Sequence, residues 1–277
     1  MLVIGELINC TRKRVGAAAE ARDAAVIREV AQKQAAGGAH MLDVNGGIPG
    51  REPETLSWLV QVVQEVVDLP LCLDSSDPEA FRAALPLCRQ RPVISSITEE
   101  PERFGRVLPL VKEYGAGVVA LAMGPDSTPS GVDDRVDNAS RLVDMLTAEG
   151  VPLADIYIDP CVLPISVGSE QGPAVADAIT RLIARYPGVH TTAGLSNVSF
   201  GLPMRRLLNQ AYLLLLISRG LDSAIVDPTD RQLMAMVRAA AALMGQDDFC
   251  SDYIGAFREG RLDIAPAAAP APAAPVA

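Results

Sequence analysis

The chain has 277 residues, of which 49% are hydrophobic, so it can bury a large core. Its 24 basic and 34 acidic residues give a net charge of −10, which argues against sequence-independent nucleic-acid binding, because that binding needs a basic surface. The five cysteines lack zinc-site spacing, and no apolar run approaches the roughly 20 residues of a membrane helix. We therefore expect a cytoplasmic protein with reduced thiols that binds neither nucleic acid nor membrane.

Apolar runs alternate with amphipathic segments eight times along the chain. The expected strands are 2–8, 41–44, 70–73, 92–95, 117–122, 155–158, 190–195 and 223–226. The expected helices are 22–37, 53–67, 78–85, 102–114, 132–148, 173–186, 203–218 and 231–244. Eight strand–helix units with no spare element predict one (β/α)8 TIM barrel over residues 1–262. The Ala/Pro-rich residues 263–277 are expected to be a disordered tail or a linker.

The carboxyl-terminal ends of the strands are where barrel enzymes place their chemistry. In this sequence those ends carry acidic, amide and hydroxyl side chains, among them Glu6, Asp43, Asn45, Asp74, Ser95, Asp159, Ser196 and Asn197. None of the three lysines lies there, which excludes a Schiff-base aldolase. His40 and His190 fall at the opposite ends of their strands, so we expect structural histidines and no metal site.

A pocket of carboxylates and amides suits a planar heterocycle that has several N–H donors on one edge. A 2-amino-4-oxopyrimidine edge is such a group, because a carboxylate can accept two parallel N–H bonds from it. The alternative role for an Asp after a strand is to cap the following helix. We assign that capping role to Asp77 and Asp227 and assign Asp43, Asp74 and Asp159 to the pocket. Cys161 lies close by, but we expect it to be a packing residue.

Five motifs carry a family resemblance that covers residues 1–260. They are IGELIN from Ile4, LDVN from Leu42, LCLDS from Leu71, YIDP from Tyr157 and GLSNVSFGLP from Gly194. With these motifs the chain resembles the pterin-binding methyltransferases. This group includes the methyltetrahydrofolate:corrinoid protein methyltransferases, their relatives in O-demethylase systems and the folate domain of cobalamin-dependent methionine synthase. The resemblance implies a TIM barrel of the pterin-binding type.

The resemblance also implies roles for individual residues. Asp74 and Asp159 match the aspartates that anchor the pterin, and Asn197 matches the amide close to N5, so these three form the implied catalytic set. Asp43 and Asn45 match a polar pair on the second strand, and Arg205 matches a basic residue beside the mouth. The implied binding site also includes Glu6, Ser95, Met123, Gly194 and Ser196. Ser95 is a departure, since the acetyl-CoA-pathway enzymes have an asparagine there.

The implied reaction moves a methyl group between N5 of tetrahydrofolate and the cobalt of a corrinoid on a partner protein, as in O-demethylase or acetyl-CoA-pathway systems. Tetrahydrofolate or 5-methyltetrahydrofolate is then the substrate, and a homodimer is expected. Two alternatives stand beside this interpretation. One is an enzyme like dihydropteroate synthase, which the missing lysine near the seventh strand disfavours. The other is a non-catalytic folate-binding module of a corrinoid assembly.

Overall fold

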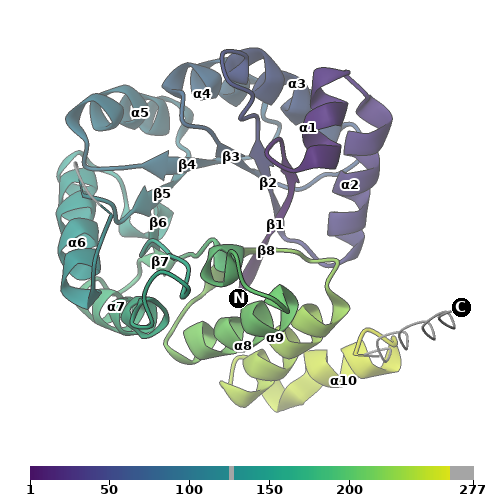
Figure 1. Cartoon of the computed structure of the whole chain (residues 1–277), viewed down its shortest axis with the longest axis vertical. Helices are drawn as coiled ribbons and strands as arrows, with labels where there is room; N and C mark the ends of the chain where they lie inside the picture. Colours follow the sequence, from purple (N-terminus) through teal and green to yellow (C-terminus); the bar gives the residue numbers. More distant parts are fainter. Residues whose placement is uncertain (125–127, 263–277) are drawn as a thin grey trace, which may run out of the picture.

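The computed structural model describes residues 1–124 and 128–262, and the expected tail lies outside them. Eight parallel strands follow one another around a ring in the order β7-β6-β5-β4-β3-β2-β1-β8 (Figure 1). Their bounds are β1 Leu2–Asn9, β2 Met41–Asn45, β3 Leu71–Asp74, β4 Val93–Ile97, β5 Gly117–Leu121, β6 Ile156–Asp159, β7 His190–Thr191 and β8 Ser223–Val226. Gly194 and Ile225 form the parallel bridge that joins the two ends of the sheet. The predicted (β/α)8 barrel is confirmed.

Helices surround the ring on its outside (Figure 1). Their bounds are α1 Lys13–Glu20, α2 Ala24–Ala36, α3 Glu52–Gln64, α4 Pro78–Ala84, α5 Pro101–Tyr114, α6 Val132–Ala148, α7 Gln171–Arg185, α8 Arg205–Ser218, α9 Arg231–Leu243 and α10 Ser251–Arg258. The expectation of no spare element is wrong, because α1 and α10 add to the eight units. No helix in the described residues is long and apolar enough to cross a membrane.

The seventh strand is shorter than the expected 190–195. It ends at Thr191, and Leu195–Ser199 forms a 3-10 helix instead. Asn197 N donates to Gly194 O over 3.2 Å, and Phe200 N donates to Asn197 O over 3.1 Å. This tight turn, rather than a strand end, carries Asn197.

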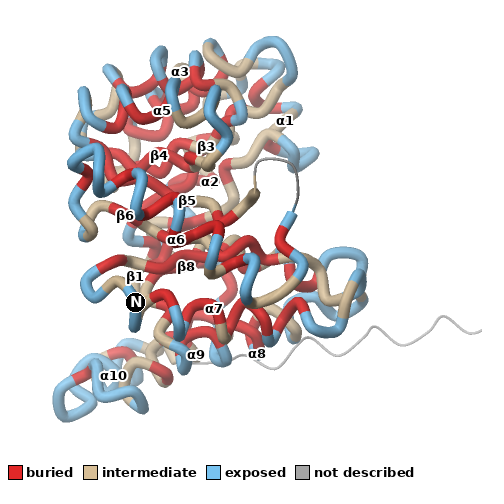
Figure 2. The backbone as a smooth tube through the Cα atoms, turned by 90° about the vertical axis from the view of Figure 1, so that its left-hand side faces the viewer, coloured by how far each residue is buried: buried red, intermediate tan, exposed pale blue. Residues whose placement is uncertain are grey.

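The barrel interior is built in two layers, because side chains two residues apart point to the same face of a strand. The lower layer is a small apolar cluster made of Ile4, Met41, Cys72, Val93 and Val119, with Tyr157 and Ile225 packed against it. Two positions after these seven residues in the sequence come Glu6, Asp43, Asp74, Ser95, Leu121, Asp159 and, just past the end of β8, Asp227. An apolar plug therefore lies beneath a mostly polar ring. The larger core lies between the strands and the inner helix faces, where Figure 2 shows most residues buried.

The amino-terminal end of the barrel holds both histidines, as expected. Val3 N donates to His40 Nδ1 over 3.0 Å, which secures the start of β1. His190 Nδ1 lies 2.6 Å from Asp222 Oδ2, and its ring stacks on Tyr157 with centroids 4.9 Å apart. Both histidines thus have structural contacts at the end opposite the polar ring.

Candidate active site

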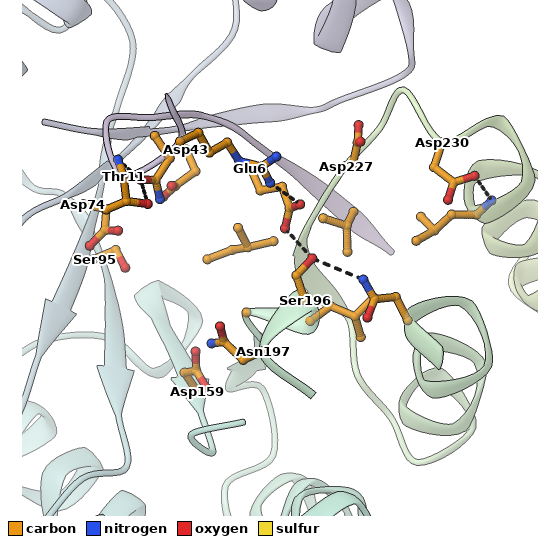
Figure 3. A pocket seen from close by; sticks show the side chains of 18 of the residues that line it. Glu6, Thr11, Asp43, Asp74, Ser95, Asp159, Ser196, Asn197, Asp227 and Asp230 are labelled. Carbon is orange, nitrogen blue, oxygen red and sulfur yellow. Dashed lines mark hydrogen bonds and ion pairs between the residues drawn. The ribbon is translucent and has the colours of Figure 1, made fainter. Parts of the chain in front are cut away.

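A cavity of about 860 Å³ opens at the carboxyl-terminal ends of the strands (Figure 3). Nine of the eleven residues that the sequence places in the binding site line it: Glu6, Asp43, Asp74, Ser95, Asp159, Gly194, Ser196, Asn197 and Arg205. Asn45 and Met123 are not among its lining residues. The strand-end reasoning therefore leads to this cavity for nine of the eleven residues.

Asn45 supports the cavity from behind. Its Nδ2 donates to Asp74 Oδ2 over 2.7 Å, and its Oδ1 accepts from Gly47 N over 2.9 Å. Burial raises the pKa of Asp74, whereas the Asn45 bond and the charge of Arg103 lower it. Asn45 thus orients Asp74 and favours its ionised form.

Asp43 is the most buried carboxylate of the cavity, with 4% of its surface exposed. Its Oδ1 has no hydrogen-bond partner among the described residues. Burial first, and the charge of Asp74 second, hold its pKa well above the ordinary value. A buried polar atom without a partner costs about 1–3 kcal/mol, so this oxygen is suited to a polar ligand or a bound water.

Asp159 lies next to Asn197 in the cavity (Figure 3). Its Oδ1 accepts from Cys161 N over 2.8 Å. Burial raises the pKa of Asp159 to about 6, against the opposing effects of the backbone N–H groups of Cys161 and Gly194 and the charge of Arg135. Asp159 is therefore mostly ionised at neutral pH and can accept hydrogen bonds.

Asn197 has an exposed side chain that points into the cavity (Figure 3). The turn around it is fixed by its neighbours: Ser196 Oγ donates to Glu6 Oε2 over 2.9 Å, and Arg205 Nη2 donates to Ser196 O over 2.6 Å. The Asn197 amide is thus presented by a held backbone and is available to a ligand.

Several polar residues of the cavity were missed by the sequence analysis. Arg12 pairs with Glu6 at 2.6 Å, and Arg206 pairs with Asp230 at 2.7 Å. Asp230 also caps α9, so the capping role assigned to Asp227 is wrong. Asp227 instead lines the cavity and accepts from Thr229 N over 2.8 Å. Pro228 suggested a helix start there, whereas the helix begins three residues later. Asp77 does cap α4, as predicted.

The chemistry available in the cavity is hydrogen bonding and charge stabilisation. No lysine or histidine is among its lining residues, and no group of metal-ligating side chains is found within residues 1–124 and 128–262. Burial raises the pKa of Cys161 to about 12, which makes its thiol a poor nucleophile.

Comparison with known proteins places this site in a wider group. Residues 5–227 match the sequence profile of a family described as pterin binding enzymes. The chain is 37% identical over 265 residues to the methylcorrinoid:tetrahydrofolate methyltransferase of Eubacterium limosum. This alignment covers 95% of this chain and 98% of that protein. It is also 37% identical over 240 residues to methionine synthase of Mycobacterium leprae (strain TN), covering 82% of this chain and 20% of that protein.

Among solved structures, the dihydropteroate synthase of Yersinia pestis in a sulfonamide drug complex aligns with a TM-score of 0.68. The alignment covers 87% of this chain and 94% of that chain at 13% sequence identity. At this identity the likeness concerns the fold alone.

Proposed function

Because the chain belongs to the family of pterin-binding enzymes, we propose that it is a methyltransferase that moves a methyl group between N5 of tetrahydrofolate and the cobalt of a corrinoid on a partner protein. The relative that matches almost its whole length carries the name methylcorrinoid:tetrahydrofolate methyltransferase. The observation that carries the proposal is the cavity itself, which is lined by three recessed carboxylates and one open amide. Its residues fit a pterin, because they offer acceptors to an N–H-rich edge.

The carboxylates bind and orient the pterin in this proposal. Asp74 and Asp159 accept hydrogen bonds from the 2-amino-4-oxopyrimidine part, and the unpartnered Oδ1 of Asp43 accepts another directly or through water. Each bond to an ionised carboxylate contributes about 1.5–3 kcal/mol. Ser95, buried in the middle of β4, offers a hydroxyl to the same ring. Binding energy is thus concentrated on the pyrimidine edge.

Asn197 acts at N5. A tertiary amine leaves only if its nitrogen gains a proton or a strong hydrogen bond as the carbon–nitrogen bond breaks. The Asn197 amide can donate to N5 as the electron pair returns to it, so its bond strengthens in the transition state. The corrinoid, when carried by its own protein, supplies a cobalt that takes or gives the methyl group.

The partner must approach over the mouth of the barrel, because the methyl acceptor lies outside this chain. The segment after β6, the segment around Asn197 and the start of α8 carry exposed apolar side chains that suit such an approach: Val167, Phe200, Met204 and Leu207. The first two segments are tied together, since Ile165 N donates to Val198 O over 3.0 Å and Ser166 Oγ donates to Phe200 O over 3.2 Å. A rigid apolar rim is thus available to a corrinoid protein.

The chain is further proposed to act as a homodimer in the cytoplasm. Exposed apolar side chains at the carboxyl-terminal helices support self-association, among them Leu243, Phe249 and Phe257. The five cysteines are unpaired thiols, as a reducing compartment favours. Light scattering that gives the mass of one chain at micromolar concentration would contradict the dimer.

The experiment that tests the proposed function mixes the purified chain, 5-methyltetrahydrofolate and a free Co(I) corrinoid, and follows the Co(I) absorbance. Loss of Co(I) with formation of a methylated corrinoid is the expected result. Folate binding without transfer, both to free corrinoid and to corrinoid proteins, would support a non-catalytic module. Condensation of a pterin diphosphate with p-aminobenzoate would support an enzyme like dihydropteroate synthase.

A further inference from the structure

Two arginines lie directly behind the cavity without lining it. Arg103 comes from the first turn of α5, and Arg135 comes from the first turn of α6. Arg135 is completely buried, and Arg103 is half-buried. The burial of a guanidinium is costly unless its charge and its five donors are satisfied, so the partners of these two side chains need a physical explanation.

Arg103 binds the main chain that follows Asp74. Its Nη2 donates to Ser75 O over 2.9 Å, and its Nη1 donates to Ser76 O over 2.8 Å. Its Nε and Nη2 both donate to Ser96 O, over 2.9 Å and 2.6 Å. One guanidinium thus clamps the ends of β3 and β4, where Asp74 and Ser95 enter the cavity.

Arg135 binds the main chain that follows Asp159 in the same way. Its Nε donates to Pro160 O over 2.9 Å, and its Nη2 donates to Cys161 O over 3.1 Å. Gly131 O and Gln171 Oε1 accept its remaining bonds, over 3.0 Å and 2.7 Å. In both cases the two carbonyls immediately after a cavity aspartate are held by one arginine.

We propose that Arg103 and Arg135 are positioning residues. Each holds its aspartate, Asp74 or Asp159, by binding the carbonyl groups of the two residues that follow it, and its positive charge stabilises the ionised aspartate without direct contact. This inference rests on the proposed function, since it assigns these aspartates to the pterin. Among the described residues, the hydrogen-bond acceptors of both guanidinium groups are carbonyl oxygens, and none is a carboxylate. An arginine paired directly with either aspartate would occupy the oxygens that the pterin needs. The indirect arrangement keeps both guanidinium groups off these oxygens.

The electrostatics agree with this arrangement. The charge of Arg103 lowers the pKa of Asp74, and the charge of Arg135 lowers the pKa of Asp159, in each case against burial, which raises it. The other titratable groups near Asp74 are Asp43, Glu52 and Cys72. Those near Asp159 are Cys161 and Tyr212. None of these neighbours is a cation, so each arginine adds a positive charge that favours the ionised aspartate, beside the hydrogen bonds that Asp74 accepts from Asn45 and that Asp159 accepts from the Cys161 and Gly194 N–H groups.

The test compares Arg103→Met and Arg135→Met with matched exposed arginines on the same helices, Arg106→Met and Arg141→Met. Tetrahydrofolate affinity is measured by calorimetry from pH 5 to pH 9, and thermal melting shows which variants fold. We expect the midpoint below which binding is lost to rise by about one pH unit in each of the two test variants, with about tenfold weaker binding near neutral pH. The control variants should keep the wild-type midpoint.

Arg103→Lys and Arg135→Lys keep the charge but satisfy fewer carbonyls. They should keep the wild-type midpoint while binding more weakly, which a merely structural role does not predict. If a methionine variant does not fold, the lysine variant at the same position is the test. A lysine variant that loses tetrahydrofolate binding at a higher pH than the wild-type chain overturns the proposal. A folded methionine variant with wild-type affinity and midpoint also overturns it. The proposed function fails separately, if the wild-type chain does not bind tetrahydrofolate at all.

Discussion

The two ends of the barrel differ in whether the aspartates beside the apolar layer of the barrel interior have basic partners. At the amino-terminal end, Arg91 pairs with Asp155 at 2.7 Å and His190 contacts Asp222 at 2.6 Å, so both acids have basic partners. At the carboxyl-terminal end, Asp43, Asp74 and Asp159 lie recessed in the cavity, and none of them forms an ion pair within the described residues. The apolar plug that includes Cys72 and Val119 separates the two ends.

This difference separates polar groups that stabilise the fold from polar groups that are available to a ligand. The paired groups at the amino-terminal end satisfy one another and leave nothing for a ligand. The carboxylates at the other end have raised pKa values, because burial destabilises their charged forms. Groups held in such an unfavourable state are typical of binding and catalytic sites.

The largest effect is expected from Asn197→Ala. The amide donates to N5 mainly in the transition state, whereas ground-state binding rests on the pyrimidine edge. Single-turnover methyl transfer to a Co(I) corrinoid should therefore fall by roughly 10²–10³. The dissociation constant for 5-methyltetrahydrofolate should stay within about tenfold of wild type. A variant that transfers at the wild-type rate would show that Asn197 only binds and that the proton reaches N5 by another path.

The next effect is the pH dependence of folate binding. Asp159 must be ionised to accept N–H bonds, and burial raises its pKa to about 6. Below that pH the free protein is protonated at Asp159, so affinity should weaken by up to about tenfold per pH unit. Calorimetric titrations from pH 5 to pH 8 measure this loss of affinity. Affinity that is flat across this range would show that Asp159 does not accept from the pterin.

Smaller effects are expected on the free energy of unfolding of the unliganded protein, and their sign should differ between a variant at the carboxyl-terminal end and one at the amino-terminal end. The folded pKa of Asp159 is raised, so its stabilising contribution is complete below the unfolded value of about 4 and is lost as the pH rises through about 6. Asp159→Asn should therefore raise the free energy of unfolding at pH 7.5 by about 1–2 kcal/mol.

Asp222→Ala provides the contrast from the amino-terminal end. It removes the partner of His190 and the acceptor of Thr191 N, so it should lower the free energy of unfolding by about 1 kcal/mol. Chemical denaturation of both variants measures the pair. A loss of stability in Asp159→Asn similar to that in Asp222→Ala would contradict the proposed difference between the two ends.

Most of the barrel could be predicted from the sequence, because burial of one strand face and one helix stripe leaves a periodic signal. The expected helix 132–148 and strand 223–226 coincide with α6 and β8. The first helix, α1, was missed because Arg12 provides no side-chain cap to mark its start. The last helix, α10, follows Phe249 and Cys250, two non-glycine residues with positive φ, which no turn motif announces.

The candidate site divides in the same way. Strand-end side chains could be located because each follows an apolar residue by two positions, as Asp74 follows Cys72. Asn45 breaks this pattern, since it bonds to Asp74 rather than lining the cavity. Arg103 and Arg135 left no signal, because their contacts depend on how far helix side chains reach beneath distant loops. The capping role of Asp230 was missed because Asp227 forms a turn with Thr229 before α9 begins.

In the proposed function, the unpaired carboxylates at the carboxyl-terminal end bind the pterin. The most direct test titrates tetrahydrofolate at pH 7.5 into Asp74→Ala and Asp159→Ala by calorimetry, with Asp222→Ala from the amino-terminal end as the matched control. The first two should lose about 2–4 kcal/mol of binding free energy, because an acceptor and its charge are removed, and the control should bind like wild type. Unchanged affinity in both cavity variants would contradict the assignment of these carboxylates to a pterin.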